Sequence, residues 1–179
     1  NAGITYAIIR CGYRGSSTGA LVEDPYFRQN MQGALSAGLK VGIYFFTQAT
    51  NEVEAVEEAS MALALCRDYK VTYPIFIDTE GAGGNGRADG LDMETRTKVC
   101  QAFCRTVEDG GYSGGIYGSR NWFRTRLRMD ELENYVIWLA EYREKPVYGG
   151  TYHLWQYTSS GSVDGIEGRV DLDISYLAY

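Results

Sequence analysis

The sequence predicts an α/β fold in which helices pack outside a parallel sheet. Apolar runs of strand length alternate with longer helical patterns through the first two thirds of the chain. The strand-like runs are apolar throughout, which is typical of strands covered on both faces. The chain has 179 residues, 45% of them hydrophobic, which is enough for one domain with a sizeable core. We therefore expect residues 1–179 to form a single domain.

The first predicted strand, residues 4–9, is followed by a helix over residues 24–39. Asp24 is a suitable N-cap for this helix, because its side chain can accept a backbone hydrogen bond. Pro25 suits the first helical position, where no N–H is needed, and Gly38 is expected near the helix end.

A second strand and helix are predicted at residues 41–46 and 51–69. This helix begins with Asn51 and Glu54, which have the spacing of a capping box. The next strand, residues 74–78, is followed by a glycine-rich loop.

A third helix over residues 92–109 is expected to stop at Gly110 and Gly111, before a strand at residues 114–117. Residues 120–132 contain only short helical turns. Three further strands joined by loops are expected at residues 135–139, 152–157 and 170–174. These seven strands are one fewer than a parallel eight-stranded barrel needs, so either the sheet is open or a first strand lies upstream.

Composition excludes several classes of function. The net charge is −6 and there is no basic patch, so nucleic acid is not an expected partner. No apolar run approaches the ~18 residues of a membrane span, and the start of the chain has no signal-peptide pattern. The chain has no CxxC pair and one histidine, so we expect no zinc site. Buried free thiols are expected at Cys11, Cys66, Cys100 and Cys104.

Two acidic residues, Asp78 and Glu80, stand at the carboxyl end of a buried parallel strand in PIFIDTEG. Active sites are built at this end of the strands in barrel and doubly wound folds. Residues two apart on a strand point the same way, so both carboxylates would face one cavity. Mutual repulsion favours a proton on one of them, and a protonated acid beside an ionised one can cleave a glycosidic bond.

Two other interpretations of this acidic pair stay open. The residues could cap a loop or carry solvated charge. They could also bind Mg²⁺ with a carboxylate from Asp171 or Asp173. No phosphate-binding motif of the type GxxxxGK[ST] accompanies them, which favours glycosidase over metal-dependent chemistry.

Beyond this pair, the chain resembles glycoside hydrolase family 25, the muramidases also called Chalaropsis-type lysozymes. Six stretches match that family in order and spacing: AGITYAIIRCGYRG, EDPYFRQNMQGALSAGLKVGIYFFTQA, YPIFIDTE, GGIYGSRNWF, IWLAEY and LWQYTSSGSVDGIEGRVDLDISY. The resemblance implies a TIM-like distorted (β/α)5(β)3 barrel. It further implies hydrolysis of the β-1,4 bond between N-acetylmuramic acid and N-acetylglucosamine in bacterial peptidoglycan, without a metal or organic cofactor. A secreted or cell-wall location follows, and a phage lysin fits equally.

The resemblance also implies roles for individual residues. Glu80 matches the family's general acid/base and Asp78 its companion carboxylate. Asp78 would stabilise either a substrate-assisted intermediate, built from the sugar's acetamido group, or the cationic transition state directly. Positions matching the family's cleft are Asp171, Tyr44, Tyr117, Tyr142 and Gln156, together with Arg10, which is expected to pair with the cleft acids.

One departure from the family concerns the start of the chain. Family members begin with a strand that carries an aspartate, in a pattern like D-V-S, and no such segment precedes Ile4. The first barrel strand is therefore expected to be absent from this chain, with Asn1 already in the connection before residues 4–9. An exposed edge there would invite pairing with another chain. The alternative function is accordingly a catalytically impaired barrel that still binds peptidoglycan.

Overall fold

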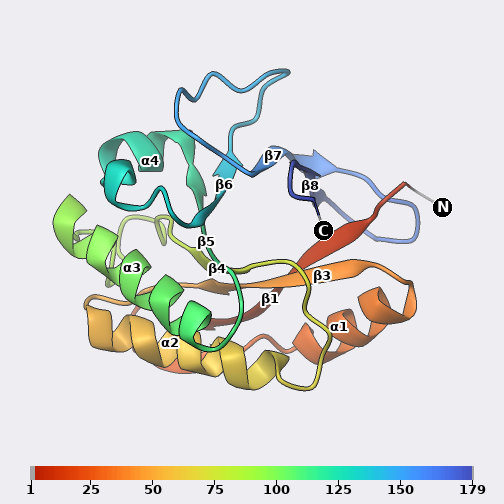
Figure 1. The fold of residues 1–179 in the computed structure, drawn as a ribbon, viewed down its shortest axis with the longest axis horizontal. Helices are drawn as coiled ribbons and strands as arrows, with labels where there is room; N and C mark the ends of the chain where they lie inside the picture. Colours follow the sequence, from red (N-terminus) through yellow and green to blue (C-terminus); the bar gives the residue numbers. More distant parts are fainter. Residues whose placement is uncertain (1–2, 179) are drawn as a thin grey trace.

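The computed structural model describes residues 3–178, which form a curled sheet covered by helices on its outer face (Figure 1). Its strands are β1 (Tyr6–Arg14), β2 (Leu21–Glu23), β3 (Lys40–Phe46), β4 (Ile75–Asp78), β5 (Gly114–Ser119), β6 (Val136–Ala140), β7 (Leu154–Gly161) and β8 (Val170–Ser175). The sheet order is β2-β1-β3-β4-β5-β6-β7-β8. Pairing is parallel from β1 to β7, while β2 and β8 are antiparallel to their neighbours.

The helices follow the strands as predicted. They are α1 (Phe27–Ser36), α2 (Glu52–Cys66), α3 (Met93–Asp109) and the short α4 (Arg120–Thr125), followed by the 3₁₀ turn η1 (Met129–Glu131). Four strand–helix units followed by three strands thus occur in residues 3–178. This is the order that the (β/α)5(β)3 prediction requires of the elements after its first strand, and the α/β fold prediction is confirmed.

Strand β2 was not predicted, and the expected count of seven strands was therefore wrong. β2 is three residues long and pairs with the carboxyl end of β1, with Gly12 opposite Glu23 and Arg14 opposite Leu21. At the other end of β1, residues 6–10 pair with β3, and no second strand among the described residues covers them. Association through this edge stays a prediction. Asn1, placed by the prediction in the preceding connection, lies outside the described residues.

Three of the four α-helices begin at a residue whose side chain caps the first turn, and one of these is α4, where Ser119 accepts from the Trp122 amide at 3.1 Å. Asn51 caps α2 by accepting from the Glu54 amide at 3.0 Å, and Asp92 caps α3 by accepting from the Thr95 amide at 2.7 Å. The Glu54 carboxylate binds the Thr50 amide at 2.8 Å, one residue before the position that a capping box uses.

The predicted start of the first helix was wrong, because α1 begins at Phe27. Asp24 lies before the helix, where one carboxylate oxygen accepts from the Tyr26 amide at 2.9 Å and the other from Arg10 Nε at 2.6 Å. The residue at the N-cap position is Tyr26, which makes no side-chain cap.

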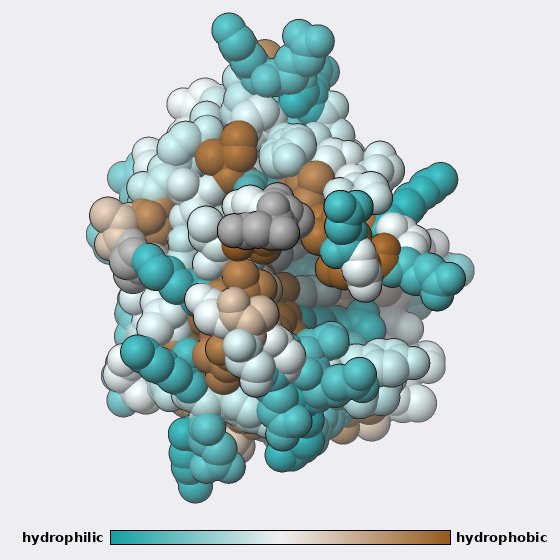
Figure 2. Space-filling view, turned by 90° about the vertical axis from the view of Figure 1, so that its right-hand side faces the viewer, coloured by the Kyte–Doolittle hydropathy of each residue, from teal (hydrophilic) through white to brown (hydrophobic). Residues whose placement is uncertain are grey.

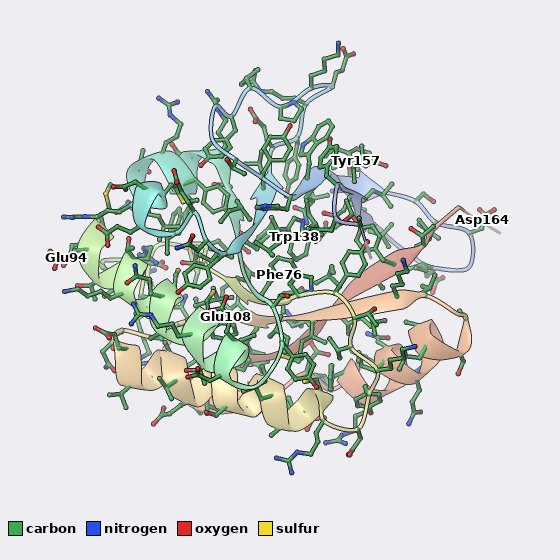
Figure 3. All side chains as sticks on the ribbon, viewed as in Figure 1. Phe76, Glu94, Glu108, Trp138, Tyr157 and Asp164 are labelled. Carbon is green, nitrogen blue, oxygen red and sulfur yellow. The ribbon has the colours of Figure 1, made fainter. Side chains whose placement is uncertain are left out.

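Successive residues of the inner strands face opposite sides of the sheet, and this divides the core in two. The outer set packs against the helices and includes Ile75, Ile77, Ile116, Ile137 and Leu139. The inner set forms a second, aromatic cluster, with Tyr73, Phe76, Tyr117, Trp138, Ala140 and Leu154. Figure 3 shows Phe76 and Trp138 on the side of the sheet away from α1 and α2.

All four cysteines are buried and free, as predicted. Burial raises the pKa of each thiol, for Cys100 to about 12. No helix in residues 3–178 is long and apolar enough to cross a membrane.

Replacing Gly115 with Ala should destabilise the protein by about 1–3 kcal/mol. A Cβ at this position of β5 would run into the ring of Phe76 and lie 3.1 Å from the Val136 carbonyl oxygen. Urea denaturation would measure the loss as a lower midpoint. The control is Gly33→Ala in α1, where the added methyl meets open space and should stabilise by about 0.5–1 kcal/mol. A Gly115→Ala protein with the wild-type midpoint would contradict this account of the inner face.

Candidate active site

A cavity of about 1110 Å³ lies on the inner side of the sheet, between β1 and β8. Six of the eight predicted site residues line it: Tyr44, Asp78, Glu80, Tyr117, Gln156 and Asp171. Ile4 and Ile166 also line it and are exposed at the surface. Figure 2 shows hydrophobic surface near the middle of the corresponding face of the molecule, framed by hydrophilic side chains. The cavity therefore joins an acidic and aromatic interior to an open, partly apolar mouth.

Asp78 and Glu80 are brought to the cavity by the continuation of β4. The Asp78 carbonyl accepts from the Thr47 amide at 3.0 Å, and the Thr79 amide donates to the Tyr117 carbonyl at 3.1 Å. These bonds keep the backbone extended past the end of the strand. Side chains two apart then share a face, as the sequence predicted, and both carboxyl groups line one cavity.

The Asp78 side chain is buried, with 5% of its surface exposed. Its Oδ1 has no hydrogen-bond partner. Burial raises the pKa of Asp78 well above its usual range, and the negative charges of Glu80 and Asp171 add to this, while Arg10 opposes it. Asp78 is therefore an acid held where its charged form is poorly solvated.

Glu80 is exposed and lies within reach of solvent and ligand. Partial loss of water around its carboxyl group raises the pKa of Glu80, and the charge of Asp171 raises it further. Burial also raises the pKa of Asp171. Three carboxyl groups at one cavity cannot all ionise without repulsion, so the site favours retention of a proton among them.

Two tyrosines and a glutamine form one wall of the site. The hydroxyl groups of Tyr117 and Tyr142 each donate to the Gln156 side-chain oxygen at 2.8 Å. Tyr142 is 54% exposed and lies at the rim, outside the residues that line the cavity itself. The shared acceptor places both phenol rings beside Gln156, and flat rings with polar tips are suited to sugars.

Arg10 does not pair with the cleft acids, and that prediction was wrong. Its Nε donates to Asp24 at 2.6 Å, and its side chain is 47% exposed. The cause is the turn before α1, which brings Asp24 next to β1. Arg10 still lowers the pKa of Asp78 through its charge, without contact.

Two residues of the cavity, Trp138 and Asp173, were not predicted to contribute to substrate binding. Asp173 had been considered only as a metal ligand. Trp138 of β6 pairs with Tyr117 of β5. Since paired residues of neighbouring strands point to the same side of the sheet, the alignment of β5 with β6 would have predicted Trp138 as a cavity residue. Asp173 follows Asp171 by two positions on β8 and shares its face.

Comparison with known proteins places this chain in a family. The model of "Glycosyl hydrolases family 25" matches residues 1–166. The chain belongs to glycosyl hydrolase family 25. The resemblance inferred from six sequence stretches is therefore confirmed.

Relatives of this family 25 chain include an autolytic lysozyme of Clostridium acetobutylicum, 30% identical over 169 residues, which cover 90% of this chain and 47% of the relative. The modular autolysin LytC of Streptococcus pneumoniae superposes with a TM-score of 0.77 at 30% identity, over 93% of this chain and 39% of LytC. The bacterial lysozyme of Streptomyces coelicolor shares the fold, with a TM-score of 0.78 at 21% identity, over 97% and 82% of the two chains. The chain spans about half the length of the curated relatives it matches.

Proposed function

We propose that this family 25 chain is a peptidoglycan hydrolase, an N-acetylmuramidase that cleaves the β-1,4 bond between N-acetylmuramic acid and N-acetylglucosamine. The observation that carries the proposal is the Asp78–Glu80 pair, which faces one cavity beside Asp171. The names of the relatives support it, since one is an autolytic lysozyme and LytC has been solved in complex with a synthetic peptidoglycan ligand.

Glu80 acts as the proton donor, because it is the more exposed member of the pair. The pKa of both carboxyl groups is raised, so exposure to the ligand, and not the pKa, distinguishes their roles. It transfers its proton to the glycosidic oxygen as the bond to the anomeric carbon breaks. The carboxylate that remains then takes a proton from the water that attacks that carbon, which restores the acid.

Asp78 acts from the buried side of the same cavity. Its unpartnered oxygen accepts the N–H of the sugar's acetamido group, if that group is the nucleophile, or faces the positive charge of the transition state. Both roles require a negatively charged oxygen at this position.

The remaining predicted residues bind the sugar chain. Tyr44, Tyr117 and Tyr142 present rings and hydroxyl groups, Gln156 fixes two of these hydroxyls, and Asp171 faces the cleft. Arg10 does not contact the sugar, and its positive charge only lowers the pKa of Asp78. Residues 1–179 serve as one catalytic domain that acts on the bacterial cell wall from outside the cell or as part of a lysin.

Digestion of purified peptidoglycan tests the proposed bond specificity. The digest is reduced with borohydride, and the reduced ends are identified by mass spectrometry. We expect reduced N-acetylmuramic acid, in the same yield with and without EDTA. Reduced N-acetylglucosamine would assign the other glycosidic bond, and loss of activity with EDTA would favour a metal-dependent hydrolase. Sedimentation with insoluble peptidoglycan without new reducing ends would favour the impaired, peptidoglycan-binding barrel.

A further inference from the structure

A buried polar contact joins the aromatic floor of the cavity to the last strand. Trp138 of β6 is 5% exposed, and its indole Nε1 donates to Asp173 Oδ1 of β8 at 2.7 Å. The indole N–H is the only polar group of this side chain and can only donate. With its acceptor removed, it would be a buried donor without a partner. Asp173 therefore fixes the rotation of the Trp138 ring.

The Trp138 ring in turn contacts aromatic residues on three other strands. Its centroid lies 4.6 Å from that of Tyr117, 5.1 Å from that of Phe76 and 6.1 Å from that of Tyr44, all edge-on. Tyr117 and Tyr44 line the cavity, and Phe76 precedes Asp78 by two residues on the same face of β4. A change in the orientation of Trp138 would thus reach both the sugar-binding rings and the backbone that carries the acids.

The carboxyl group of Asp173 stands in an unfavourable place for a charge. Burial, opposed by the hydrogen bond from Trp138 and assisted by the neighbouring charge of Asp171, raises the pKa of Asp173 to about 7. Tyr6 of β1 faces it too, with its hydroxyl buried and without a partner. An apolar side chain here would avoid this cost but would leave the indole N–H unsatisfied.

We propose that Asp173 is a positioning residue of the cleft, which holds the Trp138 indole so that Tyr44 and Tyr117 present a preformed sugar platform next to Asp78. Asp173 acts through Trp138 and does not contact the reacting atoms. The inference rests on the proposed function for its catalytic consequence, while the Trp138–Asp173 contact and its effect on sugar binding can be measured without turnover.

The test compares Asp173→Leu, which removes the acceptor, with Asp173→Asn, which keeps an acceptor oxygen without the charge. In Asp173→Leu we expect the Trp138 indole N–H to exchange with solvent at least tenfold faster, as followed by ¹⁵N NMR. We also expect kcat/KM on soluble glycan strands to fall about tenfold. Asp173→Asn should recover most of both losses. Asp109→Leu, an exposed substitution on α3, is the control for the change of residue type.

A double-mutant cycle separates positioning from direct action on the substrate. Trp138→Phe removes the N–H but keeps a ring, so adding Asp173→Leu to it should cost no more than a further twofold. A full tenfold additional loss would mean that Asp173 acts on the substrate itself and would overturn the proposal. Unchanged indole exchange in Asp173→Leu would overturn it as well.

A binding titration with N,N′,N″,N‴-tetraacetylchitotetraose keeps the two proposals distinguishable. The four proteins compared are wild type, Asp173→Asn, Asp173→Leu and Asp109→Leu. If the wild-type protein did not hydrolyse peptidoglycan, the proposed function would be wrong. The dissociation constants for the oligosaccharide would still test whether Asp173 positions Trp138. If they follow the order wild type, Asp173→Asn, Asp173→Leu, positioning is supported whatever the reaction. Equal dissociation constants for all four proteins would overturn it.

Discussion

Replacing Glu80 with Gln should reduce kcat for the lysis of purified peptidoglycan by about 10²–10⁴-fold and leave the fold intact. The amide keeps the size of the side chain but cannot donate a proton to the leaving oxygen or later accept one from water. Within residues 3–178 no hydrogen bond or ion pair holds the Glu80 side chain. Loss of solvent and the charge of Asp171 raise the pKa of Glu80, so its negative charge does not stabilise the folded state.

Turbidity of a peptidoglycan suspension and release of reducing ends would measure this effect, and thermal unfolding would check the fold. Glu133→Gln is a matched control, because Glu133 is exposed and does not line the cavity. If Glu80→Gln cleared peptidoglycan at the wild-type rate, Glu80 could not be the proton donor.

The second large effect is expected for Asp78→Asn, which should lose activity by a similar factor and gain stability at neutral pH. The loss follows because the amide cannot supply negative charge to the transition state or intermediate. The gain follows because the folded wild-type protein must either keep the Asp78 proton or bury its charge at neutral pH, and an Asn side chain requires neither. The gain is expected as a higher unfolding temperature at pH 7, in the direction that the raised pKa of Asp78 requires.

The direction of the pH dependence follows from the raised pKa of Asp78. Below the unfolded-state pKa of about 4, the carboxyl group is neutral in both states and folding has no charge to bury. As pH rises above this value, the unfolded chain releases the proton while the folded protein keeps it, so stability falls until the folded pKa is passed. Asp78→Asn should flatten this part of the curve.

Thermal unfolding between pH 3 and pH 8 would reveal the difference between the two proteins. Asp109→Asn is the control, since Asp109 is exposed at the end of α3. Should Asp78→Asn be less stable than wild type at pH 7 and equal to it at pH 3, the side chain would be stabilising as an anion, contrary to its surroundings in this structure.

The elements predicted well were those with local signals. Helices α2 and α3 have an Asn or Asp that caps the first turn, and Gly111 after α3 adopts a φ of 86°, which favours glycine. Strand β2 has only three residues and depends on its pairing with β1, so no periodicity could reveal it. The start of α1 was missed because Asp24 has two competing partners, and one of them lies 14 residues away.

For the candidate site, strand periodicity was sufficient to place Asp78 and Glu80 together, because both lie on one short segment. The contact of Trp138 with Asp173 joins residues 35 apart. It depends on the antiparallel return of β8 along β7, a pairing that neither segment encodes by itself. The ion pair of Arg10 with Asp24 was also missed, because the turn before α1, and not the pairing of strands, brings Asp24 close to Arg10.

The division of each inner strand between a helix-facing and a cavity-facing set bears on how this chain could evolve. In β4, Ile75 and Ile77 maintain the contact with the helices, while Phe76 packs in the inner aromatic cluster and Asp78 lines the cavity. Substitutions that retune glycan preference can therefore accumulate at every second position while the helix-facing positions keep the architecture. Point mutation explores the cleft freely, whereas a single-residue insertion or deletion within a strand would exchange the two sets and remove both properties at once.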